Sequence, residues 1–142
     1  MDNPGLPAGS GFMISTPTFH PFLSHFPTAL FVAGCVLLFL SHKRGQPVLA
    51  GAASLNFSLG LLASVLAALS GMFAADLEFR PITEVEGHQG YAFAMVVFLA
   101  ICTIYSYTNP FSRAARIFYL AHFLALGATL YTGYLLVFQF KG

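Results

Sequence analysis

Four long apolar stretches, separated by short polar segments, run through this chain. Each is long enough to cross the hydrocarbon core of a bilayer, which takes about 20 apolar residues in a helix. The stretches lack the alternating pattern of a barrel strand, and backbone groups in lipid must be satisfied internally, so they predict helices. The predicted spans are about 21–41, 48–74, 90–107 and 114–140. We therefore expect an all-α integral membrane protein, with a single four-helix bundle formed by residues 20–142.

The first 19 residues form a separate segment ahead of this bundle. They are polar and rich in proline and glycine, and they lack the basic start and apolar centre of a secretory signal. Pro21 suits the first turn of a helix, where its missing N–H has no partner to lose. We expect residues 1–19 to be an extended arm and the first helix to begin at His20 or just after it.

Charged residues in the loops predict how the bundle crosses the membrane. The loop after the first span carries Lys43 and Arg44, and the loop after the third carries Arg113 and Arg116. The middle loop has four acids and only Arg80 as a cation. Because cytoplasmic loops are enriched in Lys and Arg, both termini are expected outside, on the periplasmic side of a bacterial inner membrane.

Composition supports the same class of protein. The 142-residue chain is 57% hydrophobic and 8% charged, whereas a soluble domain has about 25% charged residues. It carries no basic stripe for nucleic acid, and no nucleotide-binding loop, nucleophile elbow or zinc-protease motif. Nothing resembles a general acid and base poised in a cleft. We expect neither a nucleic-acid partner nor enzymatic activity of the chain on its own.

Five histidines carry the chemistry that the sequence offers. The predicted topology places His20 and His25, in the segment HPFLSHFP, at the outer end of the first helix, and His88 at the outer entrance to the third. Ionisable groups within a membrane are costly and mark a functional site by default. Neutral imidazoles from two helices of a bundle can clamp one haem iron. We expect His25 and His88 to be the axial ligands of a b-type haem, with His20 as a propionate partner, a donor to a ligand, or an alternative ligand.

The other two histidines belong to the inner half of the predicted bundle. His42 ends the first helix, and His122 is about eight residues into the fourth, roughly 12 Å from its inner end. Together they are candidates for a second haem, although their depths differ, and a hydrogen bond from His122 to a neighbouring helix is the alternative. Histidines at a membrane interface also occur as amphipathic side chains with the polar end among headgroups. Zinc or copper bound by His20, His25 and His88 is a further alternative.

Residues expected to pack surround these histidines. Small residues spaced three or four apart in the second span predict close helix packing in lipid; they are Gly60, Ser64, Ala68 and Gly71. Aromatic residues flank the proposed haem ligands and are expected to line a porphyrin pocket; they are Phe19, Phe22, Phe26, Tyr91 and Phe93. Cys35 and Cys102 lie within helices and are expected to be unbridged, small apolar residues.

Segments around the histidines resemble a known family. HPFLSHFPTAL, which begins at His20, is similar to the opening signature H-P-x-x-x-H-F-P-x-A-L of an uncharacterised bacterial four-helix membrane family, the domain of unknown function 2231. AALSG, which ends at Gly71, resembles the end of the family's second helix, and His88 stands where the family has a histidine opening its third. TGYLLVFQFKG, which begins at Thr132, resembles the closing segment T-G-H-x-G-G-x-L-V-Y, with Tyr134 in place of the histidine.

The resemblance implies respiratory or photosynthetic electron transfer, because domains of this family are found joined to c-type cytochrome modules. It implies haem b as cofactor, and a c-type cytochrome, quinone and other membrane subunits as partners. If relatives use the histidine that Tyr134 replaces, this chain lacks one ligand. Two other functions are compatible with the residues. One is a haem-free structural or assembly subunit of a membrane complex, and the other is a proton or solute carrier, since histidine titrates near neutral pH.

Overall fold

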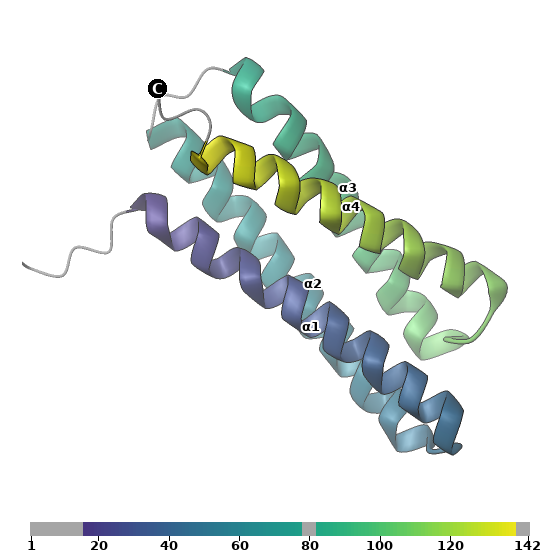
Figure 1. Cartoon of the computed structure of the whole chain (residues 1–142). Coiled ribbons are helices and arrows are strands. Elements are labelled where there is room, and N and C mark those ends of the chain that lie inside the picture. The colour runs from purple at the N-terminus through teal and green to yellow at the C-terminus, as the bar shows by residue number, and fades with distance from the viewer. Residues whose placement is uncertain (1–15, 78–81, 139–142) are drawn as a thin grey trace, which may run out of the picture.

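The computed structural model describes residues 16–77 and 82–138, which form four α-helices (Figure 1). The helices are α1 (Thr16–Arg44), α2 (Pro47–Leu77), α3 (Ile82–Thr108) and α4 (Arg113–Phe138). Each is long and apolar enough to span a bilayer. The predicted all-α architecture with four apolar helices is confirmed.

Two helices begin earlier than hydropathy predicts. α1 begins at Thr16 rather than near His20, so the last four residues of the expected arm are helical, and residues 1–15 lie outside the described residues. α3 begins at Ile82 rather than near residue 90, which places His88 in the second turn of the helix instead of at its entrance. Hydropathy finds the lipid-embedded part of a helix, whereas the hydrogen-bonded backbone continues into polar turns beyond the hydrocarbon.

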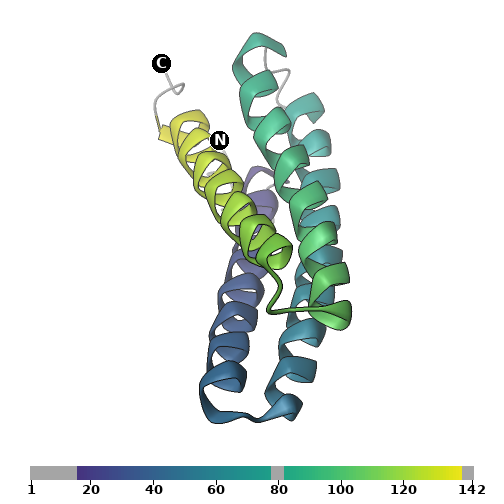
Figure 2. The same cartoon turned by 90° about the vertical axis from the view of Figure 1, so that its right-hand side faces the viewer.

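The helices are arranged as two hairpins that join along one side. α1 packs along α2, α3 packs along α4, and α2 in turn packs on α3. Figure 1 shows the two hairpins apart, and Figure 2, in which the α3–α4 hairpin lies in front, shows the connection within each hairpin. Within the described residues, no comparably extensive packing joins α1 to α4. The bundle is therefore closed along α2 and α3 and more open along α1 and α4.

A two-residue connection turns the chain from α1 into α2. Gly45 has a φ of +64°, in the left-handed region that favours glycine. The amide of Gln46 donates to the carbonyl oxygen of Ser41 at 3.2 Å, as in a Schellman C-cap. Pro47 then begins α2, where its missing N–H would have had no partner within the helix. The local sequence thus ends one helix and starts the next within two residues, which makes α1 and α2 antiparallel neighbours.

Glycines let α1 and α2 approach closely. A Cβ added at Gly34 would lie 2.5 Å from Cε1 of Phe57, so the Phe57 ring occupies the space that the glycine leaves. A Cβ added at Gly60 would lie 3.4 Å from Cβ of Leu30. Helices in lipid gain no hydrophobic free energy by pairing, so such close van der Waals contacts drive their association. The predicted packing role of the small-residue row is confirmed at Gly60.

The core lies along the middle of the bundle. Its buried apolar residues are Phe31, Leu38, Ala53, Phe57, Met95, Leu99, Cys102, Ala125 and Leu126. The hydroxyl of Ser54 on α2 donates across it to the carbonyl oxygen of Ser106 on α3, at 3.0 Å. Cys35 and Cys102 are both free, as expected from the sequence.

Replacing Gly34 with Ala should destabilise the bundle, because the new methyl group would clash with the Phe57 ring. We expect the free energy of unfolding to fall by about 1–3 kcal/mol, as for other overpacked cores. Denaturation in detergent followed by circular dichroism measures this change. Gly51→Ala is the matched control, since nothing lies within 4 Å of its added Cβ. Equal stability of the two variants would contradict the close packing of α1 on α2.

Candidate functional site

His20 of α1 and His88 of α3 meet at the end of the bundle where α1 begins and α4 ends. Their ring centroids are 6.2 Å apart, and the ring planes make an angle of 81°. Both side chains are partly buried. Because α1 packs chiefly on α2, and α3 on α2 and α4, this pair connects two helices that are otherwise little in contact. The histidine pair therefore bridges the two hairpins.

The imidazole of His20 is held by α2. Its Nδ1 lies 2.9 Å from the carbonyl oxygen of Ala67 and 3.1 Å from the hydroxyl of Ser70. A carbonyl oxygen only accepts, so Nδ1 carries the proton and donates it, which leaves Nε2 unprotonated with a lone pair. Gly71 makes room for the ring, because an added Cβ there would lie 2.8 Å from Cε1 of His20.

The imidazole of His88 is held in a similar way by α4. Its Nδ1 lies 3.0 Å from the hydroxyl oxygen of Thr132. The Thr132 hydroxyl donates to the carbonyl oxygen of Ala128 at 2.9 Å, so it accepts from the ring N–H. A Cβ added at Gly133 would lie 3.2 Å from Cε1 of His88. Both histidines are thus oriented by a bond at Nδ1, and Nε2 is the nitrogen with a lone pair in each.

The distance between the two imidazole rings is compatible with one metal ion between them. A fixed acceptor at Nδ1 orients the ring and raises the basicity of the other nitrogen. An imidazole nitrogen binds a metal at about 2 Å, so the centroids of rings on opposite sides of one ion are about 6 Å apart, close to the 6.2 Å found here. Among the described residues there is no group of three or more His, Cys, Asp or Glu side chains suited to a metal, so a three-histidine zinc or copper site is not found.

His25 lies on a different face of α1 from His20. Side chains five residues apart on a helix are separated by about 140° around its axis. His25 is exposed, and with Phe22 and Phe26 it lines a shallow depression of about 210 Å³ on the surface of α1. The expected pairing of His25 with His88 is therefore not the one in the structure, where the ring beside His88 is that of His20. Haem binding by His25 stays a prediction.

His122 is part of the core. Its Nδ1 donates to the carbonyl oxygen of Met95 on α3 at 3.0 Å, and its ring packs on Phe31 with centroids 4.1 Å apart. Only 1% of the side chain is exposed. The alternative expected from the sequence, a hydrogen bond to a neighbouring helix, is confirmed.

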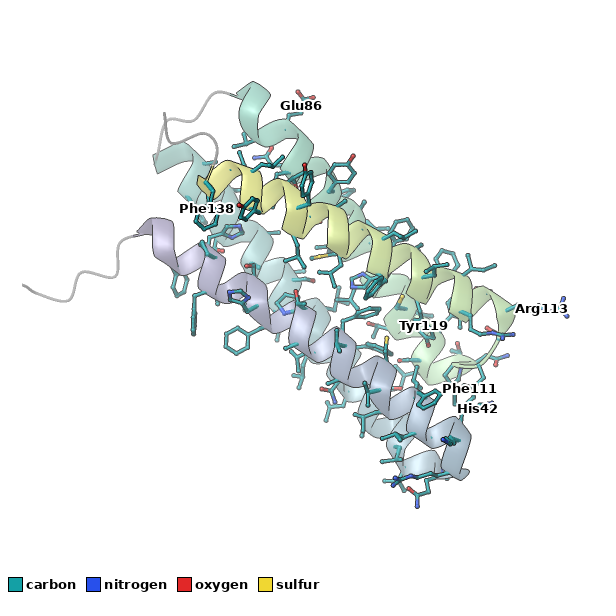
Figure 3. The ribbon with its side chains drawn as sticks, in the orientation of Figure 1. His42, Glu86, Phe111, Arg113, Tyr119 and Phe138 are labelled. Atoms are coloured by element: carbon teal, nitrogen blue, oxygen red, sulfur yellow. The ribbon has the colours of Figure 1, made fainter. Side chains whose placement is uncertain are left out.

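His42 lies exposed at the other end of the bundle, beside Phe111 (Figure 3), with ring centroids 5.1 Å apart. His122 packs on Phe31, which precedes His42 by eleven residues, or about 16 Å along α1. Two axial ligands of one haem must lie on opposite sides of one iron. The separation of His42 from His122 argues against a second haem held by both.

Among the described residues, the aromatic side chains expected to line a pocket around the histidine pair do not enclose it. The five expected to do so have exposed fractions of 47% to 72%; they are Phe19, Phe22, Phe26, Tyr91 and Phe93. Tyr134, which takes the place of a histidine in the resembled motif, is exposed and packs on Phe138 with centroids 4.8 Å apart. Small and polar residues of α2 and α4 are therefore the immediate neighbours of the pair.

Sequence reasoning missed Ser70 and Thr132, the hydroxyl partners of the two rings. A hydroxyl residue within an apolar span can indicate a polar partner on another helix. Hydroxyls in membrane helices commonly bond to their own helix instead, and both of these also do so. The row of small residues predicts only helix packing for Gly71, whereas in the structure this glycine makes room for an imidazole.

Four long apolar helices define a multi-pass membrane protein, and a close pair of partly buried imidazoles connects its two hairpins. The chain matches the family described as predicted membrane protein (DUF2231) over residues 16–141, and it belongs to that family. Comparisons with curated proteins and with solved structures gave no significant match. The segments that carry the family resemblance meet at the site, because they contribute His20, Ser70, His88 and Thr132.

Gly71→Ala should displace the imidazole of His20, because the new methyl group needs the space that the ring occupies. We expect the ring nitrogen resonances of His20 to shift in a nitrogen-15 spectrum of histidine-labelled protein in detergent micelles. Gly90→Ala is the control, since nothing lies within 4 Å of its added Cβ. An unchanged His20 signal in Gly71→Ala would contradict the placement of this ring on α2.

Proposed function

We propose that this protein binds one b-type haem between His20 and His88 and carries electrons within a membrane complex. The observation that supports the proposal is the imidazole pair, with 6.2 Å between ring centroids and each Nδ1 bonded to a neighbouring helix. Helical bundles build cofactor sites from side chains on facing helices, and haem iron takes histidine as an axial ligand.

The residues around the pair fit a haem. Gly71 and Gly133 let the two imidazoles lie close to α2 and α4, and neither introduces a side chain that would compete for the iron. The side of the bundle between α1 and α4 is the less extensively packed one among the described residues, so a flat macrocycle would extend in that direction. Haem itself supplies reversible one-electron chemistry.

The chain's own residues would hold the haem and tune it. Nε2 of His20 and of His88 are the proposed axial ligands. The carbonyl of Ala67 and the hydroxyl of Thr132 accept from the Nδ1 atoms, which keeps each ring in the required tautomer. Hydrogen bonds of this kind to axial ligands are among the means by which proteins set a redox potential.

The proposed setting is the inner membrane of a bacterium, with the histidine site near the periplasmic surface. Four cations lie at the opposite end of the bundle, near the α1–α2 and α3–α4 connections: Lys43, Arg44, Arg113 and Arg116. This end is proposed to face the cytoplasm. On the family resemblance, a c-type cytochrome would exchange electrons with the haem, and quinone or other membrane subunits would be the second partner.

A reduced-minus-oxidised optical spectrum of the purified protein, with a pyridine haemochrome count, tests the proposal. We expect a low-spin b-type signal and one haem per chain, because only one facing imidazole pair is found in the described residues. A colourless protein, prepared under conditions that preserve haem, would overturn the proposal. The histidine pair would then be a connection between helices, and a structural or assembly subunit would be favoured.

Single substitutions identify the ligands. His20→Ala and His88→Ala should each abolish the low-spin signal, whereas His25→Ala, the matched control on the same helix, should keep it. Imidazole added to His88→Ala should restore the signal, which separates a lost ligand from a lost fold. Loss of haem in His25→Ala together with retention in His20→Ala would instead support the pairing expected from the sequence. His42→Ala should leave the haem count unchanged, since His42 lies at the other end of the bundle, beside Phe111.

A further inference from the structure

A groove of about 250 Å³ opens between α1 and α4 at the end of the bundle opposite the histidine pair. Figure 3 shows His42 and Phe111 together at this end, with Tyr119 further along α4. The residues that line the groove are Cys35, Leu38, Phe39, His42, Pro110, Phe111, Arg116 and Tyr119. The groove therefore lies on the open side of the bundle, where lipid can enter from the bilayer.

The groove is apolar along most of its length. Cys35 is nine residues before the end of α1, so the groove reaches roughly 13 Å from the helix end toward the middle of the membrane. Its polar side chains, those of His42 and Arg116, lie near the helix ends. Tyr119 lines the groove, but its hydroxyl is buried and has no hydrogen-bond partner in the described part of the chain. This shape and chemistry suit a hydrocarbon chain.

Cations gather where the groove meets the membrane surface. Arg116 lines the groove, and the ammonium of Lys43 lies 6.0 Å from the ring centroid of Phe39, another lining residue. Arg44 and Arg113 are exposed at the same end. None of the five acids in the chain lies in either helix connection at this end. The mouth of the groove is therefore positively charged.

We propose that this groove binds one anionic phospholipid, with an acyl chain between α1 and α4 and the phosphate beside Arg116 and Lys43. Guanidinium groups pair with phosphate oxygens through two N–H donors, and basic pockets between membrane helices bind anionic headgroups. A zwitterionic lipid such as phosphatidylcholine would have the same chain contacts and a phosphate, but its quaternary ammonium would oppose binding to the basic mouth. A quinone fits less well, because its carbonyls need donors at a depth where the groove is apolar and the Tyr119 hydroxyl is buried.

Native mass spectrometry of the full-length protein, with equal amounts of phosphatidylglycerol and phosphatidylcholine, tests this proposal. We expect one phosphatidylglycerol to be retained per chain in preference to phosphatidylcholine. Arg116→Gln should weaken retention of phosphatidylglycerol about fivefold, the effect of one cation near an anionic headgroup. Arg113→Gln is the matched control, since it removes the same charge from the same helix but does not line the groove.

Three results would overturn the proposal. Equal retention of the two lipids would show that the groove does not recognise the headgroup charge. Equal losses of bound phosphatidylglycerol in Arg113→Gln and Arg116→Gln would indicate diffuse attraction to the basic surface rather than binding in the groove. Displacement of phosphatidylglycerol by a short-chain quinone, with binding weakened by Tyr119→Phe, would assign the groove to quinone. Circular dichroism checks that each variant keeps its helices, and the haem spectrum is a separate readout because the histidine pair lies at the other end.

Discussion

Hydrogen bonds from imidazole nitrogens to neighbouring helices are the interaction on which the arrangement of this bundle depends. His20 donates to α2, His88 to α4, and His122 to α3, each through Nδ1. In lipid no water replaces a missing partner, so a buried ring N–H without an acceptor would be costly. Each bond therefore restricts where the two helices that it joins can lie. The ring contacts of the same histidines connect α1 to α3 and α4, where backbone packing is sparse.

Glycine has a related role, because it decides what fills the space between helices. At Gly34 the space is taken by an aromatic ring of the core, and at Gly71 and Gly133 it is taken by the imidazoles of the site. Glycine therefore allows close packing in the middle of the bundle and allows the two imidazoles to fit between helices at one end. Glycine can serve both purposes because helices in lipid associate through close contact rather than through the expulsion of water.

The two ends of the bundle have different chemistry, and the open side between α1 and α4 reaches both. One end holds the imidazoles of His20 and His88, whose ring centroids are 6.2 Å apart. The other end holds a basic rim above an apolar groove, which suits a lipid with an anionic head.

The sequence by itself determined the four apolar helices and the turn between α1 and α2 at Gly45 and Pro47, because these follow from local chemistry and the lipid environment. For His122 it offered a hydrogen bond to another helix as one of two roles. It also indicated that His88 is one member of a histidine pair. For the other member it favoured His25, which is exposed, over His20, whose ring lies beside that of His88. Only the tertiary structure decided that choice, because it depends on the rotation of α1 about its axis. That rotation is set by contacts with α2, including Gly34 on Phe57 and His20 on Gly71, which are distant in the sequence.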